Sequence, residues 1–300
     1  MYRINERTDN VEIYVVRAGD TLYGIAEKYA LDPAELARLN QLADPSRLPV
    51  GLALYIPGFD EGQRPGIEVN GYAYPNISAA VLNETLPYLT FFCPFSYSMT
   101  AEGALRPIDD RRLIFSAYAA SAAPLMTVTN LSESSGFSSD IAHAVFTDEA
   151  VQNRVFDNIL STLREKKYYG INFNIEYVYP FDREGYNAFI RRAADVFHPL
   201  GYYLSTAIAP KESDAQGGLL YEAHDYASHG RYMDRVVIMT YEWGYTYGAP
   251  QAVSPVDRMR SVLAYAVTKM PAGKILMGFS NYGYSWRLPW KQGDAAAIVS

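Results

Sequence analysis

From Asn70 to the end of the chain, short apolar runs alternate with longer segments in which apolar residues recur at helical spacing. The runs have the length and the β-branched and aromatic content of buried strands. This alternation predicts an α/β domain on a parallel sheet, either closed as a barrel or open and doubly wound. Seven runs are predicted as strands: Val69–Tyr74, Leu89–Phe95, Leu125–Thr129, Gly170–Tyr177, Tyr203–Ala209, Val236–Tyr241 and Ile275–Phe279.

Helices are predicted between these strands, at Ser78–Leu86, Arg111–Ala120, Glu149–Lys166, Arg183–His198 and Pro255–Met270. No G-x-G-x-x-G turn follows a strand, which disfavours the dinucleotide-binding type of doubly wound sheet. We therefore expect a TIM (β/α)8-type barrel, in which catalytic groups lie at the C-terminal ends of the strands. Because only seven strands are found, either the last βα unit is absent or one strand escapes the pattern.

The first part of the chain follows a different order, which is strand, helix, helix, strand. Asp20 is expected to cap the first helix, and proline suits the first turn of the second. The expected elements are strands Val11–Val16 and Leu52–Ile56 and helices Leu22–Tyr29 and Pro33–Asn40.

The run Tyr14–Tyr29, followed by Leu36–Asn40 and Leu48–Pro57, resembles a LysM module from end to end. LysM modules bind glycans that contain N-acetylglucosamine, such as peptidoglycan and chitin. The resemblance implies that residues 11–57 form a small βααβ glycan-binding domain. Its candidate glycan-binding residues are Gly19, Asp20, Thr21, Leu22 and Pro49.

Residues 58–69 combine glycine, proline and charged residues, which predicts a linker. The expected organisation is therefore a LysM module at 11–57, a linker at 58–69 and a barrel at 70–300.

The composition argues against several classes of partner and cofactor. The net charge of -7 argues against nucleic acid as a partner. With Cys93 as the only cysteine and four histidines without metal-ligand spacing, we expect no disulfide, metal or other cofactor. No signal peptide and no membrane span are visible. The 26 tyrosines offer apolar faces and hydroxyls, which suit sugar binding as well as barrel walls.

The fourth predicted strand carries a polar stripe. Because side chains on a strand alternate, Asn172, Asn174 and Glu176 point to one face, and the apolar residues between them point to the other. A buried stripe of two amides and a carboxylic acid is costly unless it is paired or used. The pattern predicts an inward-facing polar site in the barrel.

This strand resembles the DxxDxDxE strand of glycoside hydrolase family 18, and the resemblance extends from about Asn70 onward. It implies that Glu176 is the general acid and that the N-acetyl carbonyl of the substrate is the nucleophile. The segment Met239–Trp243 resembles the family's MxYD segment, which implies that Tyr241 holds that carbonyl. Together, Glu176, Asn174 and Tyr241 are the candidate catalytic residues. The candidate substrate-binding residues are Asn172, Tyr177, Met239, Glu242, Trp243 and Tyr282.

The sequence departs from the family pattern at four positions. Tyr169, Asn172 and Asn174 replace the three aspartates of the strand, and Glu242 replaces the acid of MxYD. Asn174 can still accept the acetamido N–H through its carbonyl. Because an amide has no charge, Glu176 would depend on burial to keep its proton near neutral pH.

The stretch His224–Tyr226, together with Met239–Trp243, looks most like the spore-germination N-acetylglucosaminidases of this family, which also carry N-terminal LysM modules. We expect a monomeric, retaining N-acetylglucosaminidase associated with the spore coat, spore cortex or cell wall. Its expected partner is peptidoglycan or another N-acetylglucosamine polymer. The alternatives are a chitinase and a family 18-like glycan-binding protein without activity.

Overall fold

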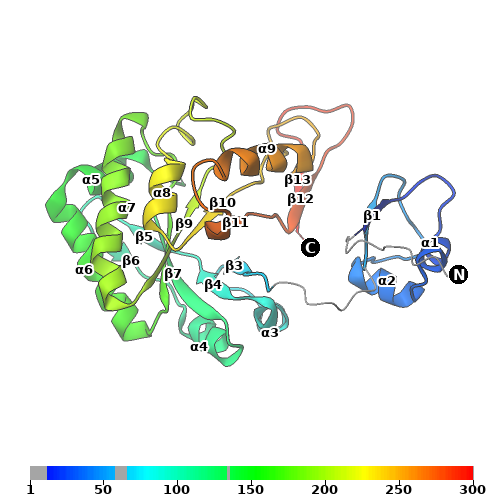
Figure 1. The fold of residues 1–300 in the computed structure, drawn as a ribbon, viewed down its shortest axis with the longest axis horizontal. Coiled ribbons are helices and arrows are strands. Elements are labelled where there is room, and N and C mark those ends of the chain that lie inside the picture. The colour runs from blue at the N-terminus through cyan, green and yellow to red at the C-terminus, as the bar shows by residue number, and fades with distance from the viewer. Residues whose placement is uncertain (1–11, 58–65, 134–135, 300) are drawn as a thin grey trace, which may run out of the picture. The chain divides into compact units, whose positions relative to one another are not determined.

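A computed structural model of the chain describes residues 12–57, 66–133 and 136–299 (Figure 1). The chain divides into two compact units, Met1–Ile67 and Glu68–Ser300. Within the described ranges, none of the helices is both long and apolar enough to cross a membrane.

The first unit has the predicted order of elements: β1 (Glu12–Val15), α1 (Leu22–Tyr29), α2 (Pro33–Leu39) and β2 (Ala53–Ile56). The two strands pair antiparallel, with Tyr14 opposite Leu54. Leu22, Ile25 and Leu36 from the helices are buried in one small core with residues of the strands. The βααβ arrangement is confirmed, although Val11 lies outside the described residues.

Helix α1 is capped by Thr21, not by Asp20. The Thr21 hydroxyl accepts a hydrogen bond from the backbone N–H of Gly24 at 3.1 Å. The Asp20 carboxylate instead accepts from the Tyr14 hydroxyl at 2.8 Å and from the Arg17 N–H at 2.7 Å. The predicted cap is therefore wrong by one residue, because Asp and Thr both cap well and the preceding turn already binds the aspartate.

The second unit contains a parallel sheet with the order β3-β4-β7-β8-β9-β10-β11. All seven strands predicted from the sequence are present, and each pairs in parallel with its neighbour. The sheet curls as in a TIM-type barrel, with helices on its outer side (Figure 1). The strands are β3 (Asn70–Ala73), β4 (Phe91–Pro94), β7 (Ala123–Thr129), β8 (Gly170–Asn174), β9 (Tyr203–Ile208), β10 (Arg235–Ile238) and β11 (Ile275–Met277).

The predicted helices coincide with α3 (Ala79–Thr85), α4 (Arg111–Ala119), α6 (Glu149–Lys166), α7 (Arg183–Phe197) and α9 (Val256–Ala266). Several short elements escaped prediction, because a few residues show no clear period. They are α5 (Ser139–Thr147), α8 (Tyr226–Tyr232), β5 (Tyr97–Met99), β6 (Leu105–Arg106), β12 (Tyr282–Ser285) and β13 (Ala296–Val299). Four 3-10 turns complete the described part: η1 (Leu86–Tyr88), η2 (Pro180–Asp182), η3 (His198–Leu200) and η4 (Ala272–Lys274).

Strand β8 separates the main core from the polar interior. Ile171, Phe173 and Ile175 are fully buried in the core that the helices share with the sheet. The Phe173 ring meets Phe189 of α7 edge to face at 5.2 Å. Asn172 and Asn174, on the other face, are buried as well. The predicted alternation therefore describes this strand correctly.

Most of the predicted linker, residues 58–65, lies outside the described residues. Its last two residues belong to the second unit. Glu68 forms a two-point ion pair with Arg235, with N–O distances of 2.5 and 2.6 Å. The N–H of Val69 donates to the Thr90 hydroxyl, and its carbonyl accepts from the N–H groups of Thr90 and Phe91. Glu68 and Val69, the last two residues of the predicted linker, therefore pack with the second unit.

Candidate active site

Glu176 lies two residues beyond the end of β8, at the carboxyl ends of the parallel strands. Its side chain is half-buried. Burial raises the pKa of Glu176 to about 7, and a side-chain hydrogen bond from Asn174 acts in the opposite direction. Near neutral pH this carboxyl is therefore poised to give up or take a proton.

Asn174 has an unused acceptor. The side chain is 6% exposed. Its amide faces Glu176, but its carbonyl oxygen Oδ1 is buried without a hydrogen-bond partner in the described part of the chain. Buried acceptors are normally satisfied, so an unpaired one beside an acid suggests a place for a donor from a ligand.

Both polar atoms of the Asn172 side chain have hydrogen-bond partners in the protein. Its Oδ1 accepts from the Tyr72 hydroxyl at 3.0 Å, and its Nδ2 donates to the Ser205 hydroxyl at 2.8 Å. These contacts join β3, β8 and β9 across the interior of the curled sheet. The residue was predicted to bind substrate, but the structure gives its amide structural partners.

Tyr241 follows β10 and is half-buried. Burial raises its pKa above the usual value, and the charges of Glu176 and Glu242 raise it further. The ring lies close to Gly278, where an added Cβ would come within 2.9 Å of a ring carbon. A glycine here lets the phenol approach the strand ends beside Glu176.

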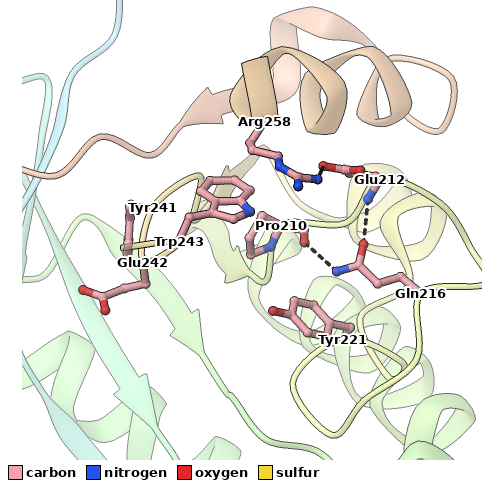
Figure 2. A pocket seen from close by; sticks show the side chains of 8 residues that line it. All are labelled: Pro210, Glu212, Gln216, Tyr221, Tyr241, Glu242, Trp243 and Arg258. Carbon is pink, nitrogen blue, oxygen red and sulfur yellow. Dashed lines mark hydrogen bonds and ion pairs between the residues drawn. The ribbon is translucent and has the colours of Figure 1, made fainter. Parts of the chain in front are cut away.

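A pocket of about 230 Å³ lies next to this group, lined by Pro210, Glu212, Gln216, Tyr221, Tyr241, Glu242, Trp243 and Arg258. The lining residues come from the loop after β9, the segment after β10 and helix α9 (Figure 2). Arg258 contacts Glu212 at 3.4 Å, and Gln216 accepts from the Glu212 N–H at 2.9 Å. The pocket therefore combines aromatic faces with fixed polar groups, as a sugar site requires. Glu176 and Asn174 are not among its lining residues.

The remaining candidate substrate-binding residues of the barrel differ in their contacts and exposure. Glu242 accepts hydrogen bonds from the hydroxyls of Tyr282 and Tyr284 on β12, so the predicted Tyr282 does reach the site. Tyr177 follows Glu176 and is 42% exposed. Met239 is buried in a small cluster with Ala207 and Val237, and packing is its visible role.

The candidate glycan-binding residues of the LysM domain differ in their exposure to solvent. Gly19, Thr21 and Pro49 are exposed. Asp20 is half-buried and bound to the turn before α1. The Leu22 side chain is only 6% exposed and belongs to the core, so it presents no side chain to a ligand.

Several pocket residues were missed by sequence reasoning, namely Glu212, Gln216, Tyr221 and Arg258. They come from an irregular loop and a helix face, where no spacing marks them. Asn130, which contacts the backbone of Glu176, was also missed. Its signal was a polar residue directly after the buried strand β7.

A carboxyl that holds a proton near neutral pH, at the strand ends of a barrel-type sheet, suits general acid catalysis on a glycosidic bond. Residues 125–296 match the glycosyl hydrolases of family 18, and residues 14–57 match the LysM domain. The chain belongs to glycosyl hydrolase family 18 and carries an N-terminal LysM domain.

Relatives of this chain are found among Bacillus proteins. It is 42% identical to the cortical fragment-lytic enzyme of Bacillus subtilis strain 168, over 96% of this chain and 78% of the relative. The crystal structure of the Bacillus cereus spore cortex-lytic enzyme SleL superposes with a TM-score of 0.76 at 37% identity. That match covers 96% of this chain and 67% of the other.

A chitinase is also similar in structure. The enzyme from Chromobacterium violaceum ATCC 12472 gives a TM-score of 0.71 at 26% identity, over 78% of this chain and 74% of that one. This chain is thus a glycosidase of family 18 with relatives of more than one named activity.

Proposed function

We propose that this chain hydrolyses the N-acetylglucosamine-containing glycan of peptidoglycan by a retaining, substrate-assisted mechanism in which Glu176 is the general acid and base. The observation that carries the proposal is the burial of Glu176, which raises its pKa to about 7. An acid with that pKa keeps a substantial protonated fraction near neutral pH, without help from a second carboxyl.

In the first step, Glu176 gives its proton to the glycosidic oxygen as the bond from that oxygen to the anomeric carbon breaks. The acetamido carbonyl oxygen of the substrate attacks the anomeric carbon and forms an oxazolinium ion. The unpaired Oδ1 of Asn174 would accept the acetamido N–H. The Tyr241 hydroxyl, protonated across the working pH range, would donate to the carbonyl oxygen.

In the second step, the Glu176 carboxylate takes a proton from water. The resulting hydroxide attacks the anomeric carbon on the face that the leaving group occupied, and the oxazolinium ring reopens. Two inversions at one carbon give net retention, and Glu176 ends the cycle protonated.

The pocket beside Tyr241 would seat a neighbouring part of the glycan, with Trp243 and Tyr221 as apolar faces. Spore cortex is the favoured form of peptidoglycan, because the names of two similar Bacillus proteins specify cortex. On this proposal the LysM domain attaches the enzyme to the spore cortex or cell wall.

Chitin hydrolysis is the second candidate, favoured by the structural likeness to the Chromobacterium chitinase. A glycan-binding protein without catalysis is disfavoured, because such a protein has no use for an acid kept half-buried with a raised pKa.

A digest distinguishes these functions. Purified cortex, vegetative peptidoglycan and chitin oligomers are incubated with the protein, and the new reducing ends are identified by mass spectrometry. We expect N-acetylglucosamine at the reducing end of cortex fragments. Glu176→Gln keeps the shape but cannot donate the proton, so turnover should fall on the order of 10²–10⁴-fold while binding persists. Release from chitin alone would establish the second candidate, and an equally active Glu176→Gln variant would refute the mechanism.

A further inference from the structure

Glu176 lies where the sheet no longer holds the backbone. The parallel ladder of β8 ends at Asn174, which pairs with Thr129 on one side and Ala207 on the other. The next residues, Ile175 and Glu176, lie outside the strand, and Tyr177 has a φ of 54°. Backbone polar groups at such a position need partners other than a neighbouring strand.

Asn130 supplies partners for both backbone groups of Glu176. It follows β7 directly and is fully buried. Its Oδ1 accepts from the Glu176 N–H at 3.0 Å, and its Nδ2 donates to the Glu176 carbonyl at 2.8 Å. The same Nδ2 also donates to the Ser138 carbonyl at 2.9 Å, which fixes the amide itself. One side chain therefore holds both backbone polar groups of Glu176.

His224 holds the preceding peptide group. Its Nδ1 accepts from the Ala209 N–H at 2.8 Å, so its proton must be on Nε2, which donates to the Ile175 carbonyl at 3.0 Å. The imidazole is 1% exposed, and burial lowers its pKa to about 4. It is therefore neutral, and in this tautomer, throughout the range where the enzyme would work.

We propose that Asn130 and His224 are positioning residues that hold the backbone of Glu176 so that its carboxyl stays at a fixed depth beside the substrate. This inference rests on the proposed role of Glu176 as the acid, and neither residue touches the reacting atoms. They act from two different strand ends, after β7 and in the segment after β9, on three consecutive backbone groups.

Depth matters because it sets the protonation state of the acid. The titratable side chains that interact electrostatically with Glu176 are Tyr177, Tyr186 and Tyr241, whose pKa values its charge raises. All three have raised pKa values and are neutral near pH 7, so burial is what keeps the acid protonated. A carboxyl that moves toward solvent loses part of this effect, and its pKa falls.

A variant of Asn130 tests the proposed positioning role. Asn130→Ala should lower kcat about 10²-fold with little change in KM, because a shift of about 1 Å in a catalytic group can have that effect. The basic limb of its pH–rate profile should also move to lower pH. Asn158→Ala is the matched control, since Asn158 makes a comparable amide contact with the Gly103 carbonyl at 2.9 Å on the distant helix α6. It should leave kcat and the profile unchanged.

Two variants of His224 test whether restored hydrogen bonds also restore kcat. His224→Phe fills the space without hydrogen bonds and should show the same fall and shift. His224→Gln can present a donor and an acceptor near the two ring nitrogens and should recover much of kcat. Circular dichroism identifies folded variants, and this pair decides the question if Asn130→Ala does not fold.

The outcomes separate this inference from the proposed function. If Glu176→Gln is as active as the wild type, the proposed function fails. If Glu176→Gln is inactive while folded Asn130→Ala, or both His224 variants, keep the wild-type kcat and basic limb, only the positioning role is overturned.

Discussion

At the scale of single residues, the protonation of Glu176 depends on an unusual neighbourhood. The two side chains before it on the same strand face are amides, Asn172 and Asn174, so neither can raise its pKa by repulsion. Burial alone has to do so, against the opposing hydrogen bond from Asn174. The acid is therefore more sensitive to hydration than to neighbouring charge.

This predicts the shape of the pH–rate profile. The first step needs Glu176 protonated, so activity should be present below its pKa and fall as pH rises through about 7. The measurement is kcat/KM on a soluble N-acetylated fragment at fixed ionic strength. A range from about pH 4 to about pH 10 spans the usual pKa values of carboxyl groups at one end and of tyrosine and lysine at the other. A basic limb near pH 10 would contradict the assignment of the proton to Glu176.

Asn174 gives the second prediction at this scale. Asn174→Ala removes the acceptor proposed for the acetamido N–H and should reduce turnover by roughly 10²-fold. The control is the substrate, because de-N-acetylated fragments lack the nucleophile and should not be cleaved by any variant. Equal rates on acetylated and de-N-acetylated fragments would exclude substrate assistance.

Asn174→Asp tests the electrostatics separately. It removes the amide donor that lowers the Glu176 pKa and adds a carboxylate that repels the ionised acid. Both effects raise the pKa, so the basic limb should move to higher pH. Because the two carboxyls would titrate together, the profile is fitted as a coupled pair. A limb that stays in place would show that Asn174 does not face the acid.

Residue-level prediction from the sequence went furthest where a period marks the side chain. The two-residue spacing placed Asn172 and Asn174 on one face of β8 and led to Glu176 two residues beyond the strand. It could not tell whether the amide of Asn172 serves a ligand or the protein, because Tyr72 and Ser205 approach it from other strands. The cap of helix α1 could not be assigned between Asp20 and Thr21 for a similar reason, because adjacent residues of both types have a high propensity to cap a helix.

At the scale of elements, the apolar face of β8 holds the strand against α7. Phe173 is fully buried there, whereas Phe181 in η2 is 73% exposed. Phe173→Ala should lower the free energy of unfolding of the second unit by about 3–5 kcal/mol. Phe181→Ala, the matched control, should change it by less than about 0.5 kcal/mol.

Tryptophan fluorescence during urea denaturation measures this loss without interference from the LysM domain. All three tryptophans, Trp243, Trp286 and Trp290, belong to the second unit. Equal losses in the two phenylalanine variants would contradict the assignment of Phe173 to the core between β8 and α7.

Elements with a strong pattern were predictable. Buried parallel strands read as apolar runs, and the long helix α6 was placed at its observed bounds. Helix α8, with seven residues, has buried Tyr226, His229 and Gly230 instead of an aliphatic stripe, so it gave no helical signal. The hairpin of β12 and β13 is rich in tyrosine, glycine and alanine, which does not distinguish a strand from a loop.

At the scale of the whole molecule, the strand order follows from rules that sequence reasoning can apply. Successive βα units place each strand beside the previous one, so β7, β8, β9, β10 and β11 are neighbours in chain order. The antiparallel pairing of β5 with β6 follows from no such rule, because it depends on the short connection between these two strands.

The division into two units gives the last prediction. The LysM unit has its own buried core around Ile25, Leu36 and Leu54, so it should fold and bind insoluble glycan by itself. The cut belongs between Ile67 and Glu68, because Glu68 is paired with Arg235 in the barrel. Removing residues 1–67 should abolish sedimentation with insoluble peptidoglycan and leave kcat/KM on short soluble fragments unchanged.

A matched deletion of residues 1–69 should be less stable, because it also removes the ion pair and the Val69 contacts with Thr90. If the shorter deletion loses turnover of soluble fragments while its tryptophan fluorescence stays native, the LysM domain takes part in catalysis and the modular interpretation is wrong.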